Sequence, residues 1–249
     1  NGADCRFGLI LRNIDIDGTV LLSSGERVFP KVIVGADGPR SMVGRAIGPG
    51  NQSLVETRQI TVPLLKPHQG TDIFLSAEFV GGYGWMFPKG EFANIGVGVS
   101  PFARSQLKPL VESIRHRLLR ESRIGEAVLM HTGGEIPVGG MVTSYGQLVG
   151  ADVFLAGDAA GLTNPITGAG ISSAVISGEL AGEAAIAAVA GERNAGNDYM
   201  DQLFDVFGPS LERALRRRQE IIDFHDVGRE LVPADLRRTW IAYPEYWAA

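Results

Sequence analysis

Residues 152–171, DVFLAGDAAGLTNPITGAGI, decide the fold of this chain. A short apolar run ends in Gly157-Asp158, and a glycine-rich loop then leads into an alanine-rich segment. The run predicts a buried strand that brings the Asp158 carboxylate to the carboxyl end of a sheet, where open α/β folds bind ligands. The segment after the loop predicts a helix whose first N–H groups are free to face a ligand. The alternative is a glycine-rich helix entry that binds nothing.

The residue types of this loop suit a flat ligand that carries sugar hydroxyls. Asp158 can accept hydrogen bonds from the hydroxyls, and Pro165 stiffens the loop because its ring fixes φ. Gly168 and Gly170 lack side chains, so a ligand can approach the main chain closely. Small residues follow four apart along the predicted helix and indicate close packing of another backbone; they are Gly170, Ala174, Gly178 and Gly182. Two glutamates in the same segment favour a helix of a soluble protein over a membrane-spanning helix.

Composition narrows the class of protein and of site. The 249 residues can bury one large core or two small ones, and 45% hydrophobic with 20% charged residues is ordinary for a soluble globular protein. A net charge of −5 argues against a nucleic-acid partner. One cysteine excludes a disulfide framework, and the four histidines show no zinc-ligand spacing, so we expect no metal site. We find no signal peptide and no uncharged apolar span, and we expect a cytoplasmic protein.

The order of the predicted elements indicates a mixed α/β (α+β) fold. Asp17-Gly18 lies between two apolar runs and predicts a hairpin. The β-branched run Val32–Val34 predicts a strand buried on both faces. Residues 54–100 read as an antiparallel sheet, because strand formers alternate with Gly and Pro rather than with helical segments. Helical periodicity predicts a helix at 104–123, and we also expect helices at 41–47, 168–190 and 198–227.

Two motifs, taken together, resemble those of the flavoproteins that include the aromatic hydroxylases. The Gly-Asp loop resembles that family's second FAD-contacting motif, and residues 35–41, GADGPRS, resemble its Asp-Gly motif. The resemblance implies that the Asp-Gly motif supports the FAD pyrophosphate and that Asp158 binds the ribityl or ribose hydroxyls. It also implies that loop N–H groups face the pyrimidine edge of the flavin. The implied cofactor-binding residues are Asp37, Gly38, Gly157, Asp158, Pro165, Gly168, Ala169, Gly170 and Ile171.

A third stretch is similar to a motif of the geranylgeranyl reductases. Residues 83–89, YGWMFPK, followed by Gly96-Val97-Gly98, resemble the Tyr-x-Trp-x-Phe-Pro … Gly-x-Gly motif of these enzymes. The resemblance implies hydride transfer from reduced FAD to isoprenoid double bonds of (bacterio)chlorophyll side chains or prenyl lipids, with NADPH or ferredoxin as electron donor. Alternation along a strand puts Tyr83, Trp85 and Phe87 on one face. We expect them to line an apolar cavity for the prenyl chain; the alternative is that they are sheet core.

The chain departs from the family pattern in its first third. The family binds the ADP half of FAD with an N-terminal Gly-x-Gly-x-x-Gly strand–turn–helix, and neither this motif nor the reductases' N-terminal cysteine motif occurs here. We therefore expect a fragment that lacks an N-terminal segment of the same protein and is inactive alone. The expected division is residues 1–50 and 141–190 as parts of the FAD domain, 51–140 as the substrate-binding sheet and 191–249 as helices.

Other interpretations stay open from the sequence alone. One is a flavin monooxygenase or halogenase of the same fold, and another is a non-catalytic domain that keeps the fold without the flavin. The late arginine cluster of Arg213 and residues 216–218 predicts a solvated helix face, with an anionic membrane surface as the alternative. The aromatic residues near the C-terminus predict a helix-packing edge, with peripheral contact to a lipid interface as the alternative.

Overall fold

The computed structural model describes residues 2–248, which form two compact units. Unit 1 comprises Asn1–Gln52, Gly139–Asn164 and Ala169–Glu212. Unit 2 comprises Ser53–Val138, Pro165–Gly168 and Arg213–Ala249. Each unit has its own buried core.

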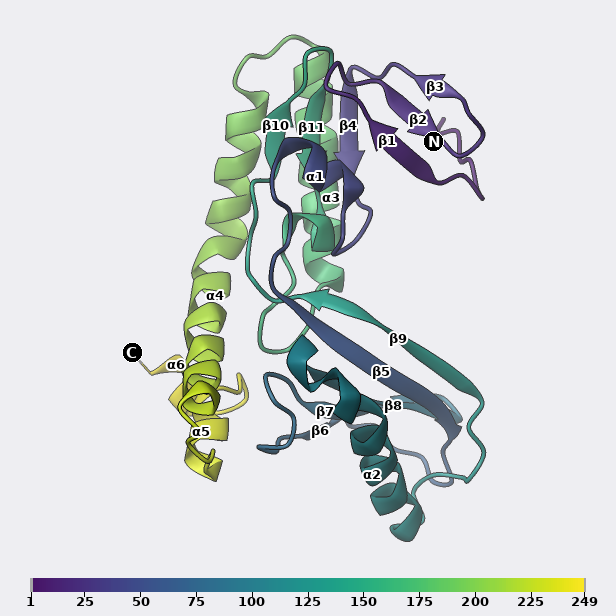
Figure 1. Cartoon of the computed structure of the whole chain (residues 1–249), viewed down its shortest axis with the longest axis vertical. Coiled ribbons are helices and arrows are strands. Elements are labelled where there is room, and N and C mark those ends of the chain that lie inside the picture. Colours follow the sequence, from purple (N-terminus) through teal and green to yellow (C-terminus); the bar gives the residue numbers. More distant parts are fainter. Residues whose placement is uncertain (1, 249) are drawn as a thin grey trace. The chain divides into compact units, whose positions relative to one another are not determined.

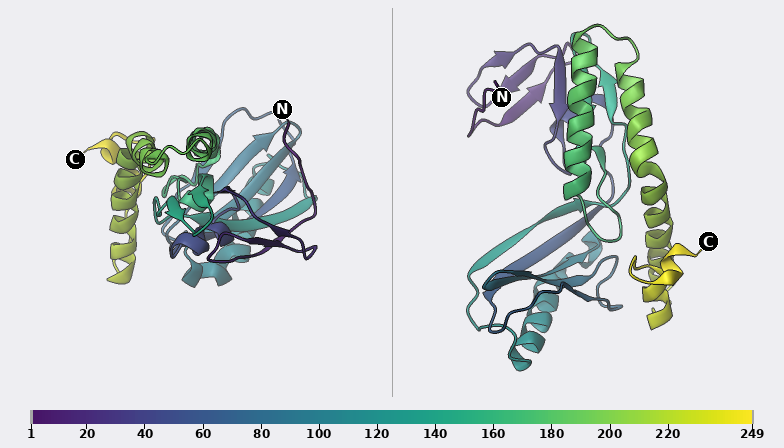
Figure 2. Two further views of the ribbon diagram at one scale, coloured as in Figure 1. Left: turned by 90° about the horizontal axis from the view of Figure 1, so that it is seen from above. Right: turned by 180° about the vertical axis from the view of Figure 1, so that it is seen from behind.

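Unit 1 is built around a small sheet with strand order β10-β11-β4. Strands β11 (Asp152–Leu155) and β4 (Val32–Gly35) pair in parallel, with Val153 opposite Ile33, and β10 (Tyr145–Gln147) pairs with β11 in antiparallel. Helices α1 (Met42–Ile47) and α3 (Ile171–Val189) lie on opposite faces of this sheet, as Figures 1 and 2 show. The predicted helix at 41–47 and the buried strand before Gly157 are therefore confirmed.

A second sheet of unit 1 contains the predicted hairpin. Strands β1 (Leu11–Ile14), β2 (Val20–Leu22) and β3 (Arg27–Val28) form an antiparallel meander. Gly18 has a φ of +85°, and its N–H donates to the Asp15 carbonyl over 2.9 Å. The Asp-Gly turn is confirmed, because glycine adopts this left-handed conformation without steric cost.

Helix α4 (Ala195–Asp226) contributes its first part to the core of unit 1. Tyr199 of this helix is buried, its ring meets Phe154 edge-on at 5.3 Å between centroids, and its hydroxyl donates to the Leu155 carbonyl over 2.5 Å. Burial raises the pKa of Tyr199, so the hydroxyl remains a donor at neutral pH. The tyrosine therefore satisfies a polar group of β11 inside the core.

The edge of this sheet corrects one sequence prediction. β4 is an edge strand in the described part of the chain, and the side chain of Val34 is 44% exposed, so β4 is not buried on both faces. One face of α3 is open as well: Ile171 is 87% exposed and Ile186 is 73% exposed. Added Cβ atoms at Gly178 and Gly182 would meet no heavy atom within 4 Å. Among residues 2–248, the predicted close packing of another backbone on the small-residue stripe is therefore absent at Gly178 and Gly182, whereas Gly157 packs on Ala174.

By length and composition alone, α3 is the one described helix that could cross a membrane. This is weak evidence, because a core helix passes the same test. Ser177, Ala181 and Ala184 of α3 are buried, and α3 contacts β4 and β11. Among the described residues, α3 therefore packs on the sheet with one narrow stripe and leaves the rest of its surface exposed.

Unit 2 is built on a five-stranded antiparallel sheet with order β6-β7-β8-β5-β9. The predicted sheet at 54–100 is confirmed, and one later strand extends it. Helix α2 (Leu107–Arg120), preceded by the 3-10 helix η1 (Pro101–Gln106), lies against one face (Figure 1). The strands are β5 (Leu54–Pro63), β6 (Asp72–Phe74), β7 (Gly84–Lys89), β8 (Phe92–Val99) and β9 (Met130–Pro137).

The core of unit 2 lies between α2 and the sheet. The predicted apolar stripe of α2 packs here, with Leu110, Ile114 and Leu118 buried together with Met86 and Ile95. The predicted helix at 104–123 is confirmed, although the regular α-helix begins at Leu107.

The late arginine cluster does not form one solvated face. Arg217 is only 6% exposed; its Nη1 pairs with Glu220 over 2.7 Å and its Nε donates to the Tyr246 carbonyl over 3.2 Å. Arg218 also turns inward, whereas Arg216 is exposed. The prediction is wrong for two of the four arginines. The chain after α4, with α5 (Pro233–Arg238) and α6 (Pro244–Trp247), folds back onto Arg217, whereas Arg218 donates to the Gly81 carbonyl.

Candidate functional site

The Gly-Asp loop of unit 1 is held by side-chain contacts around Asp158. β11 ends at Leu155, and the 3-10 helix η2 (Gly157–Ala160) follows. Thr163 donates its hydroxyl to Asp158 Oδ1 over 2.5 Å. An added Cβ at Gly170 would lie 3.1 Å from Asp158 Oδ1 and 2.7 Å from Thr163 Oγ1. The carboxylate therefore lies beside the start of α3, and this close approach requires glycine at 170.

Gly157 makes a second close approach at the same place. Its φ is +57°, and an added Cβ would lie 3.0 Å from the Cβ of Ala174. The Ser177 hydroxyl accepts the Gly157 N–H over 2.9 Å. The turn into the loop thus packs directly on the first turns of α3. This packing requires glycine at 157 and small residues at Ala174 and Ser177.

Asp37 of the Asp-Gly motif serves the N-terminus of α1. Its carboxylate accepts the Ser41 hydroxyl over 2.5 Å and the N–H groups of Met42 and Val43 over 2.7 and 3.2 Å. An acidic group there satisfies free helix donors and complements the helix dipole. Gly38 has a φ of +83°, and an added Cβ would meet nothing within 4 Å. The turn at Gly38 is therefore open to an approaching group.

Asn51 connects the two motifs and was not predicted. Its side-chain Nδ2 donates to the Pro39 carbonyl over 3.0 Å and to the Asp158 carbonyl over 2.8 Å. Both acceptors are carbonyls, so the orientation of the amide is settled by its donors. Its Oδ1 is buried and has no hydrogen-bond partner. Position 51 carries no local signal in the sequence, because its partners are 12 and 107 residues away.

The aromatic residues of unit 2 form a row along β7. The ring centroids of Tyr83 and Trp85 are 5.6 Å apart, and those of Trp85 and Phe87 are 5.8 Å apart. Trp85 is buried, and its Nε1 donates to Gln59 Oε1 over 3.0 Å. Trp240 extends the row at 4.9 Å from Tyr83, a contact that the sequence did not indicate.

A small cavity of about 30 Å³ lies at one end of this row. Tyr83 and Trp85 line it, as do Pro165 and Gly168 of the predicted flavin loop, whereas Phe87 does not. The space is about that of one water molecule. The structure therefore brings residues predicted for the substrate and residues predicted for the cofactor to one place within unit 2.

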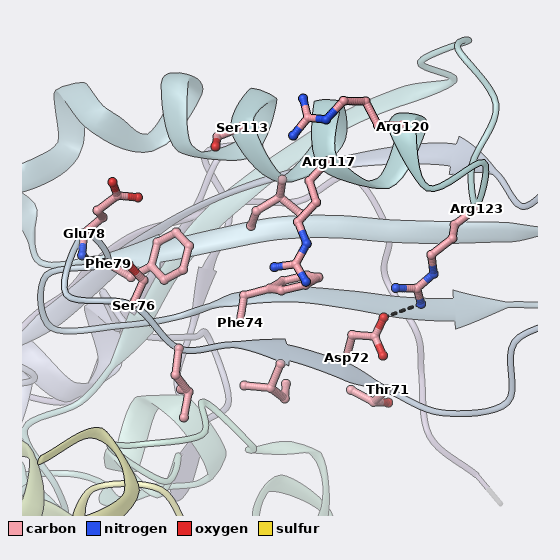
Figure 3. Close-up of a pocket in the computed structure, with 13 residues that line it drawn as sticks. Thr71, Asp72, Phe74, Ser76, Glu78, Phe79, Ser113, Arg117, Arg120 and Arg123 are labelled. Atoms are coloured by element: carbon pink, nitrogen blue, oxygen red, sulfur yellow. Dashed lines mark hydrogen bonds and ion pairs between the residues drawn. The ribbon is translucent and has the colours of Figure 1, made fainter. Parts of the chain in front are cut away.

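The larger cavity of unit 2 contains none of the predicted site residues. It has a volume of about 690 Å³ and lies between α2 and the segment around β6 (Figure 3). Arg123 pairs with Asp72 (Figure 3). Arg117 donates to Glu121 over 2.9 Å. The Arg117 guanidinium also lies 5.5 Å from the ring centroid of Phe74. Two of its three arginines are thus paired with carboxylates, and we assign no ligand to it.

Possible metal ligands do not cluster in the described part of the chain. No group of three or more His, Cys, Asp or Glu side chains there could hold a metal ion. Cys5 is exposed and free.

Comparison with known proteins identifies the family. The chain matches no protein-family model. It is 30% identical over 242 residues to digeranylgeranylglycerophospholipid reductase of Methanosarcina acetivorans, and 35% identical over 193 residues to that of Methanothrix thermoacetophila. The chain belongs to the geranylgeranyl reductase family. These alignments cover 90% and 73% of the chain, but only 54% and 47% of the relatives, so the chain spans about half the length of the curated relatives it matches.

Solved structures support the fold of this family. A geranylgeranyl bacteriochlorophyll reductase-like protein from Thermoplasma acidophilum matches with a TM-score of 0.71 at 24% identity, over 96% of this chain and 66% of that one. A probable FAD-dependent monooxygenase from Pseudomonas aeruginosa matches with a TM-score of 0.56 at 22% identity, over 88% of this chain and 66% of that one. The predicted fold class is confirmed: the neighbours are oxidoreductases with the same mixed α/β architecture.

Proposed function

We propose that this chain is part of an FAD-dependent oxidoreductase that reduces isoprenoid C=C bonds in prenyl lipids or (bacterio)chlorophyll side chains. The observation that carries the proposal is the meeting of two motifs at one cavity. The Tyr83–Trp85 row and the Pro165–Gly168 loop line the same space in unit 2. The names of the curated relatives support this substrate class.

The residues of the Gly-Asp loop fit FAD. The missing side chain at Gly170 leaves room for Asp158 and Thr163, and the Asp158 carboxylate beside the start of α3 offers an acceptor for sugar hydroxyls. We propose that Asp37, Gly38, Gly157, Asp158, Pro165, Gly168, Ala169, Gly170 and Ile171 hold the cofactor. FAD, when bound, supplies the hydride.

The aromatic row fits a long apolar substrate. A prenyl chain offers no charge, so its binding depends on apolar contact and exclusion of water. The Trp85 N–H is already taken by Gln59, so the indole presents ring surface and no free donor. We propose that Tyr83, Trp85 and Phe87 wall the substrate site and orient the double bond.

A segment outside these 249 residues would complete unit 1. Parallel sheets are normally covered on both faces, and proteins normally protect the edge strands of their sheets. Within residues 2–248, the edge strand β4 exposes Val34, and α3 exposes Ile171 and Ile186. We propose that an N-terminal segment of the same protein, with a Gly-x-Gly-x-x-Gly turn, pairs with β4, covers α3 and binds the ADP half of FAD.

The remaining partners follow from the reaction. Reduction of a double bond consumes two electrons, and we propose NADPH or ferredoxin as their source. A prenyl substrate resides in lipid, which favours a cytoplasmic protein that contacts the membrane peripherally.

The test uses the protein with its upstream sequence. We expect bound FAD in the visible spectrum and, under anaerobic reduction, addition of two hydrogens per double bond to a geranylgeranyl lipid. Asp158→Ala should weaken FAD binding, whereas Thr163→Val, which keeps the carboxylate, should weaken it less. Trp85→Ala should lower turnover and retain FAD. Oxygen-dependent hydroxylation or halogenation without alkene reduction would instead support a monooxygenase or halogenase, and absence of flavin would support a non-catalytic domain.

A further inference from the structure

Two side chains that are distant in sequence hold the loop Pro165–Gly168 within unit 2. The Tyr83 hydroxyl donates to the Thr167 carbonyl. The Arg218 Nη1 lies 3.4 Å from the Pro165 carbonyl and donates to the Gly81 carbonyl over 2.6 Å. One arginine thus contacts the loop and the turn that precedes Tyr83.

The surroundings of Arg218 are unusual for a cation. Among the described residues no carboxylate lies within ion-pair distance of its guanidinium, whereas the adjacent Arg217 pairs with Glu220. Burial lowers the pKa of Arg218 to about 10. This value is still well above neutral pH, and the side chain therefore stays charged. A partly buried charge that faces only carbonyl dipoles is costly. In return for this cost, the guanidinium holds the Gly81 turn and the Pro165 carbonyl together.

The turn at Gly81, whose carbonyl accepts from Arg218, is tightly packed. Gly81 has a φ of +69°, and an added Cβ would lie 2.1 Å from Ser100 Oγ. An added Cβ at Gly82 would lie 2.1 Å from the Gly98 carbonyl oxygen. The turn before Tyr83 therefore packs tightly against the end of β8 and is a firm support for Arg218.

The loop also packs on the sheet. Gly168 has a φ of +66°, and an added Cβ would lie 3.3 Å from Ile136 Cδ1 and 3.9 Å from the Tyr83 hydroxyl oxygen. Burial raises the pKa of Tyr83 to about 12, which keeps its hydroxyl protonated and able to donate. Two side chains and one apolar contact thus hold this loop against the sheet.

We propose that Arg218 and Tyr83 are positioning residues that hold the Pro165–Gly168 loop in its ligand-binding conformation, coupled through the Gly81 turn to the aromatic row. The ligand follows from the proposed function: the loop presents its main chain to the flavin. Neither residue needs to touch the reacting atoms, since both act through loop carbonyls. Tyr83 consequently has a role besides that of a wall for the substrate.

The first experiment measures amide hydrogen exchange of the 249-residue chain without cofactor. We expect Arg218→Met and Tyr83→Phe to raise exchange of the loop amides by about tenfold each, as loss of one hydrogen bond allows. Exchange in β5 and β8 should not change, which shows that the variants fold. Arg216→Met, at an exposed position of the same helix, should leave the loop unaffected. Unchanged loop exchange in both test variants would overturn the attachment.

The second experiment measures FAD affinity and the visible spectrum of the protein with its upstream sequence. We expect Arg218→Met to weaken FAD binding and alter the flavin spectrum, and Arg218→Lys, which keeps a charged donor, to restore part of both. A loosened loop with unchanged FAD affinity and spectrum would overturn the positioning role. A protein that never binds FAD would overturn the proposed function, and the exchange data would still decide whether the loop is attached.

Discussion

The indole of Trp85 occupies the space that a side chain at Gly96 would need. The register of β7 and β8 places the two residues opposite each other. An added Cβ at Gly96 would lie 2.3 Å from Trp85 Cζ2 and 2.9 Å from the Arg58 carbonyl oxygen. The aromatic half and the glycine half of the family motif are therefore one packing unit, in which the glycine creates the room for the ring.

Gly96→Ala should destabilise the chain by about 1–3 kcal/mol, because the added methyl group overpacks a buried site that backbone closes on one side. It should also displace the indole and change its fluorescence. Urea unfolding measures the first effect and the emission spectrum the second. Gly134→Ala is the matched control, since a Cβ there meets nothing within 4 Å. Equal stability of the two variants would contradict this account.

Asn51→Asp should cost about 1–3 kcal/mol of unfolding free energy. A carboxylate cannot donate, so the Pro39 and Asp158 carbonyls lose their donor and face a negative charge instead. Gln52→Glu is the control: the Gln52 amide also donates to two carbonyls, those of Pro49 and Gly50, but it is exposed. Its expected cost is below about 0.5 kcal/mol. Similar losses for the two changes would indicate that Asn51 does not connect the motifs.

Asp37→Ala should destabilise unit 1 by about 0.5–2 kcal/mol, even without cofactor, because it removes the acceptor for the first N–H groups of α1. Asp37→Asn keeps one acceptor oxygen and should cost less. Denaturant unfolding of the cofactor-free chain measures both. If neither variant changes the free energy of unfolding, the Asp37 carboxylate does not stabilise the N-terminus of α1.

Buried tyrosines should make the fold sensitive to alkali. Burial raises the pKa of Tyr83 from 10.0 to about 12, so the folded chain keeps a proton that the unfolded chain releases. The associated stability is fully present below about pH 10 and is lost as the pH rises towards 12. Tyr83→Phe should flatten this decline, and the tyrosinate absorbance of the wild type should show a late-titrating hydroxyl. A hydroxyl that titrates near pH 10 would show that Tyr83 is not buried in solution.

The local sequence was sufficient to predict those secondary-structure elements that depend on residues close together in the chain. The Asp17-Gly18 turn, the apolar stripe of α2 and the strand before Gly157 each depend on turn chemistry or periodicity, which act over one or two turns of chain. The family motifs could also be recognised, because their residues lie close together in sequence. The resemblance they carried is confirmed by the relatives.

Tertiary structure alone decided which side chains are buried against distant partners. Arg217 and Arg218 belong to a charged run typical of a solvated face, yet carbonyls from residues 81, 165 and 246 receive their hydrogen bonds. Val34 belongs to a run typical of a buried strand, yet it lies at an open edge. The reason is physical: a side chain's own composition sets the cost of burial, but whether it is buried depends on groups far along the chain.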